Sequence, residues 1–233
     1  MIPLRAVIII CAQAEWQAVR SLLPLPSQPD DAGMAWIASQ SDGSALHWVH
    51  SGWGKTAAAA ATQHAIDRWQ PDLLINLGTC GGLAGCCQLG EVLLVEETVQ
   101  YDIRESMGEA QAALLHYTAK ADYSWIAEPL PAGTRRCRLA SADRDILPEE
   151  AEMLRREYNV PAADWESGAV TWVAARNQTP WLILRGVSDL TDGNSSETAG
   201  QLALWQERCG TIMQKLVECL PWYLRQFQQN FIK

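Results

Sequence analysis

The stretch Thr179–Asp192, with the sequence TPWLILRGVSDLTD, contains the side chains best suited to acid–base chemistry. Its apolar run Trp181–Leu184 follows a proline and precedes a glycine, which predicts a strand buried on both faces of a parallel sheet. Arg185, Ser188 and Asp189 come directly after this run. Ligands bind at the carboxyl ends of strands in open α/β sheets, so a substrate would meet these residues there. Asp189, a carboxylate at the mouth of an apolar strand, is therefore a candidate proton donor.

Two further carboxylates stand near the beginnings of predicted helices. Glu15 lies in the first turn of a helix predicted over Ala12–Leu23, immediately after the buried strand Ala6–Cys11. Glu166 precedes a helix predicted over Val170–Asn177. A structural alternative is open for both positions, since an acid at a helix N-terminus complements the helix dipole or caps the helix. The functional alternative for Glu15 is that it faces the mouth of the preceding strand, where ligands bind.

A glycine-rich segment follows another predicted strand, Leu73–Leu77. In Gly78–Gly82 (GTCGG), the hydroxyl of Thr79 and backbone N–H groups such as that of Gly81 could meet an oxygen-rich ligand. The alternative is that this segment is only a tight turn. A second segment, Gly54-Lys55-Thr56, resembles the end of a phosphate-binding loop, but the first glycine of that motif is missing and we reject this interpretation.

The alternation of strands and helices predicts an α/β protein. We expect one three-layer α/β/α domain spanning residues 1–233, with no linker and with a central sheet that is mixed and mostly parallel. The other predicted elements are a hairpin of Met34–Ser39 and Ala45–His50, helices at Thr56–Trp69, Met107–Ala119, Pro148–Tyr158 and Thr198–Phe227, and strands at Gly90–Val95 and Arg138–Ala140.

The composition is that of a globular protein with a sizeable core, since 48% of the residues are hydrophobic and 19% are charged. A net charge of −9 argues against nucleic acid or an anionic membrane as a partner, because both select basic surfaces. The apolar N-terminal stretch is too short for a signal peptide. A membrane-spanning helix needs about 18 consecutive apolar residues, and no stretch of the sequence is that long. We therefore predict a cytoplasmic protein. The 7 Cys and 4 His show no paired metal-ligand spacing, so we expect reduced thiols, no metal site and no cofactor.

Five short motifs, spread over most of the chain, carry a resemblance to a known family. They are AQAE (Ala12–Glu15), SGWGK (Ser51–Lys55), INLGTCGGLAG (Ile75–Gly85), DWESGAV (Asp164–Val170) and RGVSD (Arg185–Asp189). In these motifs and their order the chain resembles the nucleoside phosphorylase/nucleosidase family, type I, and most of all its methylthioadenosine/S-adenosylhomocysteine nucleosidase branch. The resemblance leaves out Ser106–Pro131. It implies the nucleoside phosphorylase-like fold, a small-molecule nucleoside substrate, and a homodimer or higher homo-oligomer.

The resemblance also implies roles around the base and the sugar. Asp189 matches the family's acid that protonates or hydrogen-bonds N7 of a purine, and Ser188 would orient that acid. This role is chemically sound, because cleavage of the N-glycosidic bond leaves negative charge on the base and an acid of raised pKa can neutralise it. Glu166 matches the residue that binds the ribose hydroxyls. Trp165 takes the place of the family's usual methionine beside the sugar.

The choice between hydrolysis and phosphorolysis depends on the residues near the attacking group. By the same resemblance, Glu15 matches the nucleosidase acid that holds and deprotonates water, and Arg185 would help place that water or orient Glu166. Phosphorylases of the family carry a phosphate-binding arginine two residues before the glycine that opens the glycine-rich segment, where this chain has Asn76. An additional carboxylate repels phosphate but suits water, so we predict a hydrolase, with a phosphorylase as the alternative.

The identity of the substrate's base is left open by the residue at the position that stacks on adenine in the nucleosidases. Around Ser141–Ile146 the nucleosidases carry an aromatic residue that stacks on adenine, and this chain has Asp145. Trp16, Trp53 or Trp165 would be the alternative aromatic side chains to stack on the base, or the base differs from adenine. We predict a purine-type nucleoside like methylthioadenosine or S-adenosylhomocysteine, with a futalosine-type nucleoside as the alternative. A non-catalytic nucleoside-binding or regulatory protein is the alternative of another class, but it would not need all three carboxylates.

Overall fold

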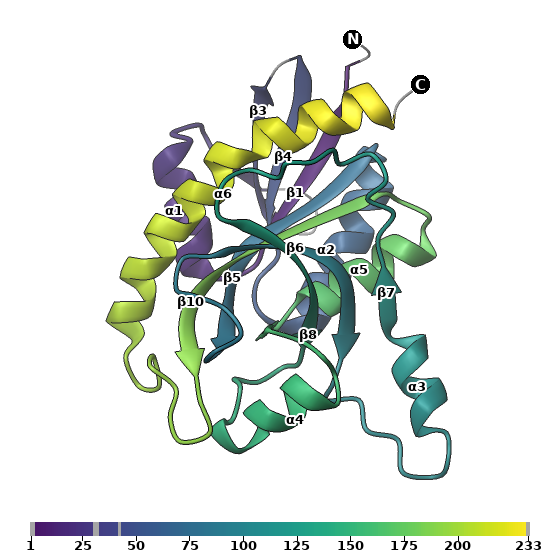
Figure 1. Cartoon of the computed structure of the whole chain (residues 1–233). Coiled ribbons are helices and arrows are strands. Elements are labelled where there is room, and N and C mark those ends of the chain that lie inside the picture. Colours follow the sequence, from purple (N-terminus) through teal and green to yellow (C-terminus); the bar gives the residue numbers. More distant parts are fainter. Residues whose placement is uncertain (1–2, 30–32, 42, 232–233) are drawn as a thin grey trace.

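In the part of the chain that the structure describes, ten strands form one mixed sheet with helices on both sides (Figure 1). The computed structural model describes residues 3–29, 33–41 and 43–231. The strands are β1 (Arg5–Ile10), β2 (Gln28–Pro29), β3 (Ala35–Ser41), β4 (Ser44–His50), β5 (Leu73–Leu83), β6 (Val92–Gln100), β7 (Thr118–Lys120), β8 (Thr134–Ser141), β9 (Ala162–Asp164) and β10 (Trp181–Thr191). The helices are α1 (Gln13–Leu22), α2 (Gly54–Trp69), α3 (Ala110–His116), α4 (Ala151–Arg156, after a 3₁₀ turn at Pro148–Glu150), α5 (Ser167–Arg176) and α6 (Leu202–Asn230).

One half of the sheet is built around β1. This strand pairs in parallel with β4 on one side and with β5 on the other. Its residues from Ala6 to Ile10 are all buried. A parallel strand covered on both faces must be apolar at successive positions, which is why this run could be predicted from the sequence.

The other half of the sheet closes on itself. β5 pairs with β10, β10 with β6, β6 with β8, β8 with β9, and β9 again with β5. The three residues of β9 complete this ring, and two of them, Ala162 and Ala163, lie opposite Gly82 and Gly81 of β5. The α/β class with a mixed sheet is confirmed, and five of the ten described strand pairings are parallel. The ring is a feature that the sequence did not predict.

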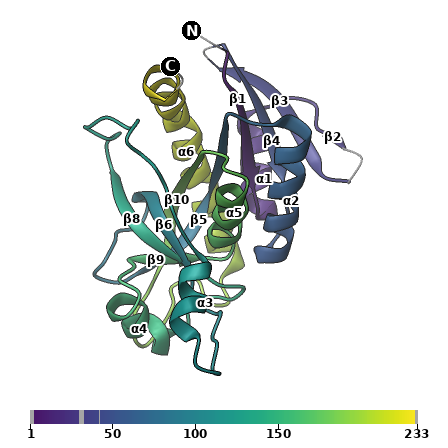
Figure 2. The same ribbon diagram turned by 90° about the vertical axis from the view of Figure 1, so that its right-hand side faces the viewer.

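Two pairs of helices cover the two faces of the sheet (Figure 2). α1 packs against α6 on one face, and α2 packs against α5 on the other. The face of α6 that packs on the sheet is apolar, with the buried residues Ile212, Met213, Leu216, Leu220 and Leu224. None of the helices that the structure describes is both long and apolar enough to cross a membrane.

β5 is longer than the sequence predicts, because the segment Gly78–Gly82 is a continuation of the strand. The interpretation of this segment as a turn is therefore wrong. A Cβ on Gly78 would overlap Nη1 of Arg185, and one on Gly82 would overlap Sγ of Cys87. These glycines make room for neighbouring side chains against an extended backbone, a non-local requirement that the local sequence does not reveal.

β10 is also longer than predicted, and it contains the whole of Arg185–Asp189. The register with β5 shifts within this part of the strand, so that Asp189 lies opposite Gly81 and Ser188 has no partner on β5. Such a bulge bends a strand and changes the direction of its side chains. It occurs here at the residues predicted to carry the chemistry.

The segment Ser106–Pro131 contains α3 and β7. α3 is shorter than the helix predicted over Met107–Ala119. Before α3 the chain forms a turn, in which the carboxylate of Glu105 accepts hydrogen bonds from the backbone N–H groups of Met107 and Glu109. After α3, residues Thr118–Lys120 pair with β6 as β7, so α3 ends before Ala119. The helix predicted over Pro148–Tyr158 is a 3₁₀ turn followed by the short α4.

The close packing of α6 on β10 requires a glycine at position 186, since a Cβ there would overlap Cγ2 of Ile212. Gly186→Ala should lower the free energy of unfolding by about 1–3 kcal/mol, measured by urea denaturation. Ile212→Leu removes that Cγ2 and should restore part of the loss. Gly193→Ala is the control, because nothing lies within 4 Å of the added Cβ. A Gly186→Ala protein as stable as this control would contradict the packing argument.

Candidate active site

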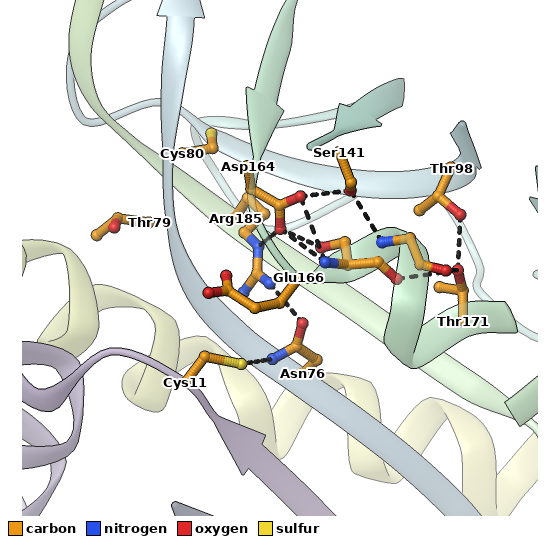
Figure 3. A network of polar contacts seen from close by, with 12 residues as sticks. Cys11, Asn76, Thr79, Cys80, Thr98, Ser141, Asp164, Glu166, Thr171 and Arg185 are labelled. Atoms are coloured by element: carbon orange, nitrogen blue, oxygen red, sulfur yellow. Dashed lines mark hydrogen bonds and ion pairs between the residues drawn. The ribbon is translucent and has the colours of Figure 1, made fainter. Parts of the chain in front are cut away.

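A buried arginine lies at the centre of the polar residues (Figure 3). Arg185 is only 1% exposed. Its Nε donates a hydrogen bond to Oδ2 of Asp164 at 2.7 Å, and its Nη2 donates to Oδ1 of Asn76. The amide nitrogen of Asn76 in turn donates to the backbone carbonyl of Ile9 at 2.9 Å. This chain of contacts joins β10, β9, β5 and β1 at one point.

Asp164 also fixes the start of α5. Its carboxylate accepts hydrogen bonds from Oγ of Ser141 at 2.6 Å and from the backbone N–H of Ser167 at 3.0 Å. Asp164 is therefore the acid that caps this helix. Glu166 occupies the N-cap position but makes no side-chain cap bond, and its carboxylate reaches Gly54, the first residue of α2, instead.

Hydrogen bonds continue from Ser141 into the buried start of α5 (Figure 3). The backbone N–H of Gly168 donates to Oγ of Ser141 at 2.8 Å, and its carbonyl accepts from Nε2 of Gln100 at 3.1 Å. The hydroxyls of Thr98 and Thr171 lie 2.6 Å apart further along. Because these buried polar groups satisfy one another, they hold the turn that carries Glu166 in one arrangement.

Glu15 is buried, at 5% exposure, and is held by three donors. Its Oε1 accepts hydrogen bonds from the backbone N–H of Thr79 at 2.6 Å and from the Thr79 hydroxyl at 2.9 Å. Its Oε2 accepts from the backbone N–H of Ala12 at 3.1 Å. The oxygen-rich group that Thr79 meets in the structure is therefore this carboxylate. Since two carboxylate oxygens offer about four acceptor positions, Oε2 can still accept from water.

Glu166 is partly buried, and its Oε1 accepts a hydrogen bond from the backbone N–H of Gly54 at 3.0 Å. Burial, together with the negative charges of Asp164 and Glu15, raises the pKa of the Glu166 carboxyl to about 8. The Gly54 hydrogen bond and the positive charge of Arg185 oppose this rise. Trp165 is partly buried in the same turn.

Asp189 lies at the bulge of β10. Its Oδ1 accepts a hydrogen bond from the hydroxyl of Ser188 at 2.5 Å. Burial raises the pKa of the Asp189 carboxyl, and the hydroxyl of Ser188 opposes the rise. A Cβ on Gly81 would stand 3.5 Å from Oδ2 of Asp189 and 3.2 Å from Cδ1 of Ile146, so both side chains lie against the bare backbone of Gly81.

The structure gathers Glu15 and Glu166 around Arg185. A Cβ on Gly78 would overlap Nη1 of Arg185 and stand 2.9 Å from Oε1 of Glu15, so the two charges face each other across this glycine. Asp189 lies further along β10 than Arg185, opposite Gly81 of β5, whereas Arg185 lies opposite Gly78. Three residues of strand span roughly 10 Å. The two ends of the site are thus separated by a distance that the sugar and base of one nucleoside can bridge.

Sequence reasoning missed Asp164, which makes more of the site's contacts than any predicted residue. The available signal was its place two residues before Glu166 in the motif DWESGAV. Asp145, the residue in place of the base-stacking aromatic, is exposed. Burial is the main cause of the raised pKa of Asp189, and the negative charge of Asp145 adds to it. The neighbouring Ile146 is buried beside Gly81.

Two hollows on the surface, of about 610 and 580 Å³, lie elsewhere. Residues 85–91, 133–134 and Lys215 line the first, and residues 23–25, 38–40 and 45–47 line the second. Since neither contains a predicted site residue, we assign the candidate site from the convergence of charged side chains. Over the described ranges, no three His, Cys, Asp or Glu side chains are grouped so that they could hold a metal ion.

Comparison with known proteins agrees with this arrangement of motifs. The sequence model of the phosphorylase superfamily matches residues 7–218. The chain belongs to this superfamily. A 5′-methylthioadenosine/S-adenosylhomocysteine nucleosidase of Geobacillus thermodenitrificans is 26% identical over 205 residues, which are 83% of this chain and 87% of that relative. The resemblance named from the five motifs is thereby confirmed.

Solved structures of nucleosidases and of a futalosine hydrolase share the fold. The 5′-methylthioadenosine nucleosidase of Arabidopsis thaliana in its apo form has a TM-score of 0.80 and 22% identity, and the match covers 94% of this chain and 96% of that one. A futalosine hydrolase mutant of Helicobacter pylori has a TM-score of 0.74 and 16% identity, with 93% and 98% covered. At these identities the structural likeness establishes the fold.

The raised pKa of Glu166 predicts a stability that depends on pH. An acid whose pKa is higher in the folded state holds its proton more tightly there, so folding is disfavoured as the pH rises from the ordinary 4.5 to about 8. Glu166→Gln cannot ionise and should escape this loss. Its melting temperature should therefore exceed that of the wild type by a margin that grows between pH 5 and pH 8.

Glu157→Gln, at an exposed position of the chain, is the matched control for thermal unfolding. Its difference from the wild type should be the same at pH 5 and at pH 8. A Glu166→Gln protein whose difference from the wild type also stays constant across this range would show that burial does not perturb the carboxyl as described.

Proposed function

We propose that this protein hydrolyses the N-glycosidic bond of a purine-type nucleoside, such as methylthioadenosine or S-adenosylhomocysteine. The observation that carries the proposal is the separation of three acidic side chains into two environments along β5. Glu15 and Glu166 lie at the end that holds Arg185, and Asp189, with its raised pKa, lies at the other end. One end suits a sugar and a nucleophile, and the other suits a leaving base.

Asp189 acts on the base. A carboxyl whose pKa is raised by burial keeps its proton at a higher pH than an exposed one, so it can donate to N7 as the bond to the sugar breaks. The hydroxyl of Ser188, 2.5 Å from Oδ1, fixes the rotation of the carboxyl. The proton thus meets the charge that develops on the leaving base.

Glu15 acts on the attacking water. The three hydrogen bonds from Thr79 and Ala12 hold its carboxylate in one orientation, with acceptor capacity left on Oε2. A water bound there would lose its proton to Glu15 as it attacks the sugar carbon. Arg185 does not need to touch this water, because it acts as the positive charge that keeps Glu15 and Glu166 close together.

Glu166 acts on the sugar. With a pKa raised to about 8, the Glu166 carboxyl is largely protonated at neutral pH, so one oxygen can accept a hydrogen bond from a ribose hydroxyl while the protonated oxygen donates to the neighbouring one. The Gly54 N–H holds Oε1 in place. Trp165, in the same turn, offers an aromatic surface to the positive charge that develops on the sugar. The backbone of Gly81, against which the side chains of Asp189 and Ile146 lie, is the part of β5 next to the base.

Hydrolysis is favoured over phosphorolysis because of the groups around Arg185. Asn76 is neutral, and both ends of its amide are engaged by Arg185 and by the carbonyl of Ile9. The carboxylate of Glu15 nearby would repel a phosphate anion, and Glu166 adds to this repulsion where it is ionised. The names of the relatives support methylthioadenosine or S-adenosylhomocysteine as substrate, with a futalosine-type nucleoside as the second candidate.

We further propose that the chain is one domain that works in the cytoplasm as a homodimer or higher homo-oligomer, without a metal or organic cofactor. The family resemblance supports the oligomer, and the acidic composition supports the absence of a nucleic-acid partner.

Release of free base from a panel of nucleosides, with and without phosphate, tests the reaction. We expect adenine and a free 5′-substituted ribose from methylthioadenosine or S-adenosylhomocysteine, at the same rate without phosphate. Base release that requires phosphate, with a sugar 1-phosphate as product, would make the protein a phosphorylase. Binding of nucleosides without any base release would identify a binding protein.

Asp189→Asn tests the role of the acid. Because an amide cannot donate a proton in the same way, turnover should fall by about 10²–10⁴-fold in a base-release assay. Nucleoside binding, measured by calorimetry, should change by less than tenfold. Asp192→Asn, three residues away at an exposed position, is the control and should keep its activity. Undiminished turnover in the Asp189 variant would remove this residue from the mechanism.

A further inference from the structure

The segment Gly54-Lys55-Thr56, which resembles a phosphate-binding loop in sequence, makes other contacts in the structure. Nζ of Lys55 forms an ion pair with Oδ1 of Asp102 at 2.5 Å. The two side chains are 16% and 22% exposed, respectively. The lysine therefore connects the beginning of α2 to the turn that follows β6.

A third residue closes these contacts into a ring. The backbone N–H of Asp143 donates to Oδ2 of Asp102 at 3.1 Å, and Oδ1 of Asp143 accepts from the backbone N–H of Lys55 at 2.6 Å. The geometry is possible because β6 and β8 run parallel and end together, with Gln100 opposite Ser141. Three segments far apart in the sequence are thus tied together, and we call Lys55, Asp102 and Asp143 the loop-tying ring.

The ring adjoins the candidate active site at two points. Gly54, next to Lys55, donates its backbone N–H to Glu166. Gly54 has a φ of +83°, and a Cβ there would stand 3.0 Å from Oδ1 of Asp143, so both the backbone and the space require glycine. On the other side, the loop after Asp143 leads to Ile146, which packs beside Gly81 near Asp189.

We propose that Lys55 and Asp102 are positioning residues: they hold the Gly54 N–H against Glu166 and the Asp143–Ile146 loop against the base end of the site. This inference rests on the proposed nucleoside hydrolysis for its effect on catalysis. Neither side chain touches a reacting atom. Loosening the ring should weaken the binding of the sugar more than the chemical step, because Glu15 and Asp189 keep their own hydrogen-bond partners.

Steady-state base release from methylthioadenosine separates this role from a general contribution to folding. Lys55→Met and Asp102→Asn should each raise KM about tenfold and change kcat less than about threefold. The double variant should be no worse than either single variant, since each one opens the same ring. Lys55→Arg should restore KM to within about threefold of the wild type, because arginine also pairs with a carboxylate.

The control is the ion pair of Arg135 with Glu91, which has an Nε–Oε1 distance of 2.7 Å and is also partly exposed. Arg135 and Glu91 contact none of the three proposed catalytic carboxylates in the described structure. Arg135→Met should lower the melting temperature about as much as Lys55→Met while leaving KM unchanged. Equal KM values for the two variants, or a loss in kcat alone for Lys55→Met, would overturn the proposal.

Hydrogen exchange measured by mass spectrometry gives a result that does not depend on activity. In Lys55→Met, the backbone amides of residues 52–57 and 142–147 should exchange faster than in the wild type and in Arg135→Met. If the wild type releases no base from any nucleoside, the proposed function fails, and this exchange measurement alone decides the inference. Unchanged exchange in both segments would overturn it.

Discussion

The ion pair between Arg185 and Asp164 is the interaction on which the rest of the site depends. Both side chains are only 2% exposed. Two buried charges are tolerated when they are paired and hydrogen-bonded, and removal of one partner from such a pair typically costs about 3–5 kcal/mol. Here the pair also sets positions: it joins the strand that carries Asp189 to the short strand that leads into Glu166.

The same arginine allows two more carboxylates to lie nearby. Glu15 and Glu166 would repel each other more strongly without the positive charge of Arg185 nearby. Burial first, and then repulsion by Asp164 and Glu15, still raises the pKa of Glu166 to about 8. Shifts of this kind occur where side chains are arranged for chemistry at a cost in stability. Arg185 is held in place by buried hydrogen bonds to Asp164 and Asn76, and Asp164 in turn by one from Ser141.

Much of this could be predicted from the sequence, because the relevant signals are local. The apolar runs that form β1 and the first part of β10 identified the buried strands, and Glu15 and Asp189 stand close to their ends. The motifs gave the family. Position along the chain was therefore enough to propose Glu15 and Asp189 as candidate acids.

What the sequence did not reveal depends on contacts between distant segments. Gly78–Gly82 has the composition of a turn, and only the side chains of Arg185 and Cys87 explain why glycines are needed in a strand. Asp164 is one acid among many until its partners are known. β6 extends through Glu96 and Glu97, which do not suggest a strand, because Arg136 and Arg138 of β8 pair with them across the sheet.

The ring formed by β5, β10, β6, β8 and β9 also affects how the protein behaves in a crowded solution. An open sheet exposes unpaired backbone groups along its outermost strands, and these can recruit strands of other molecules into aggregates. In the described part of the chain, closing the ring leaves two edge strands. One is β2, at the end of the strand order beyond β3, and the other is the short β7 beside β6. β2 has two residues, one of them a proline that offers no N–H. The three residues of β9 therefore help to protect a strand-rich protein from edge-to-edge association.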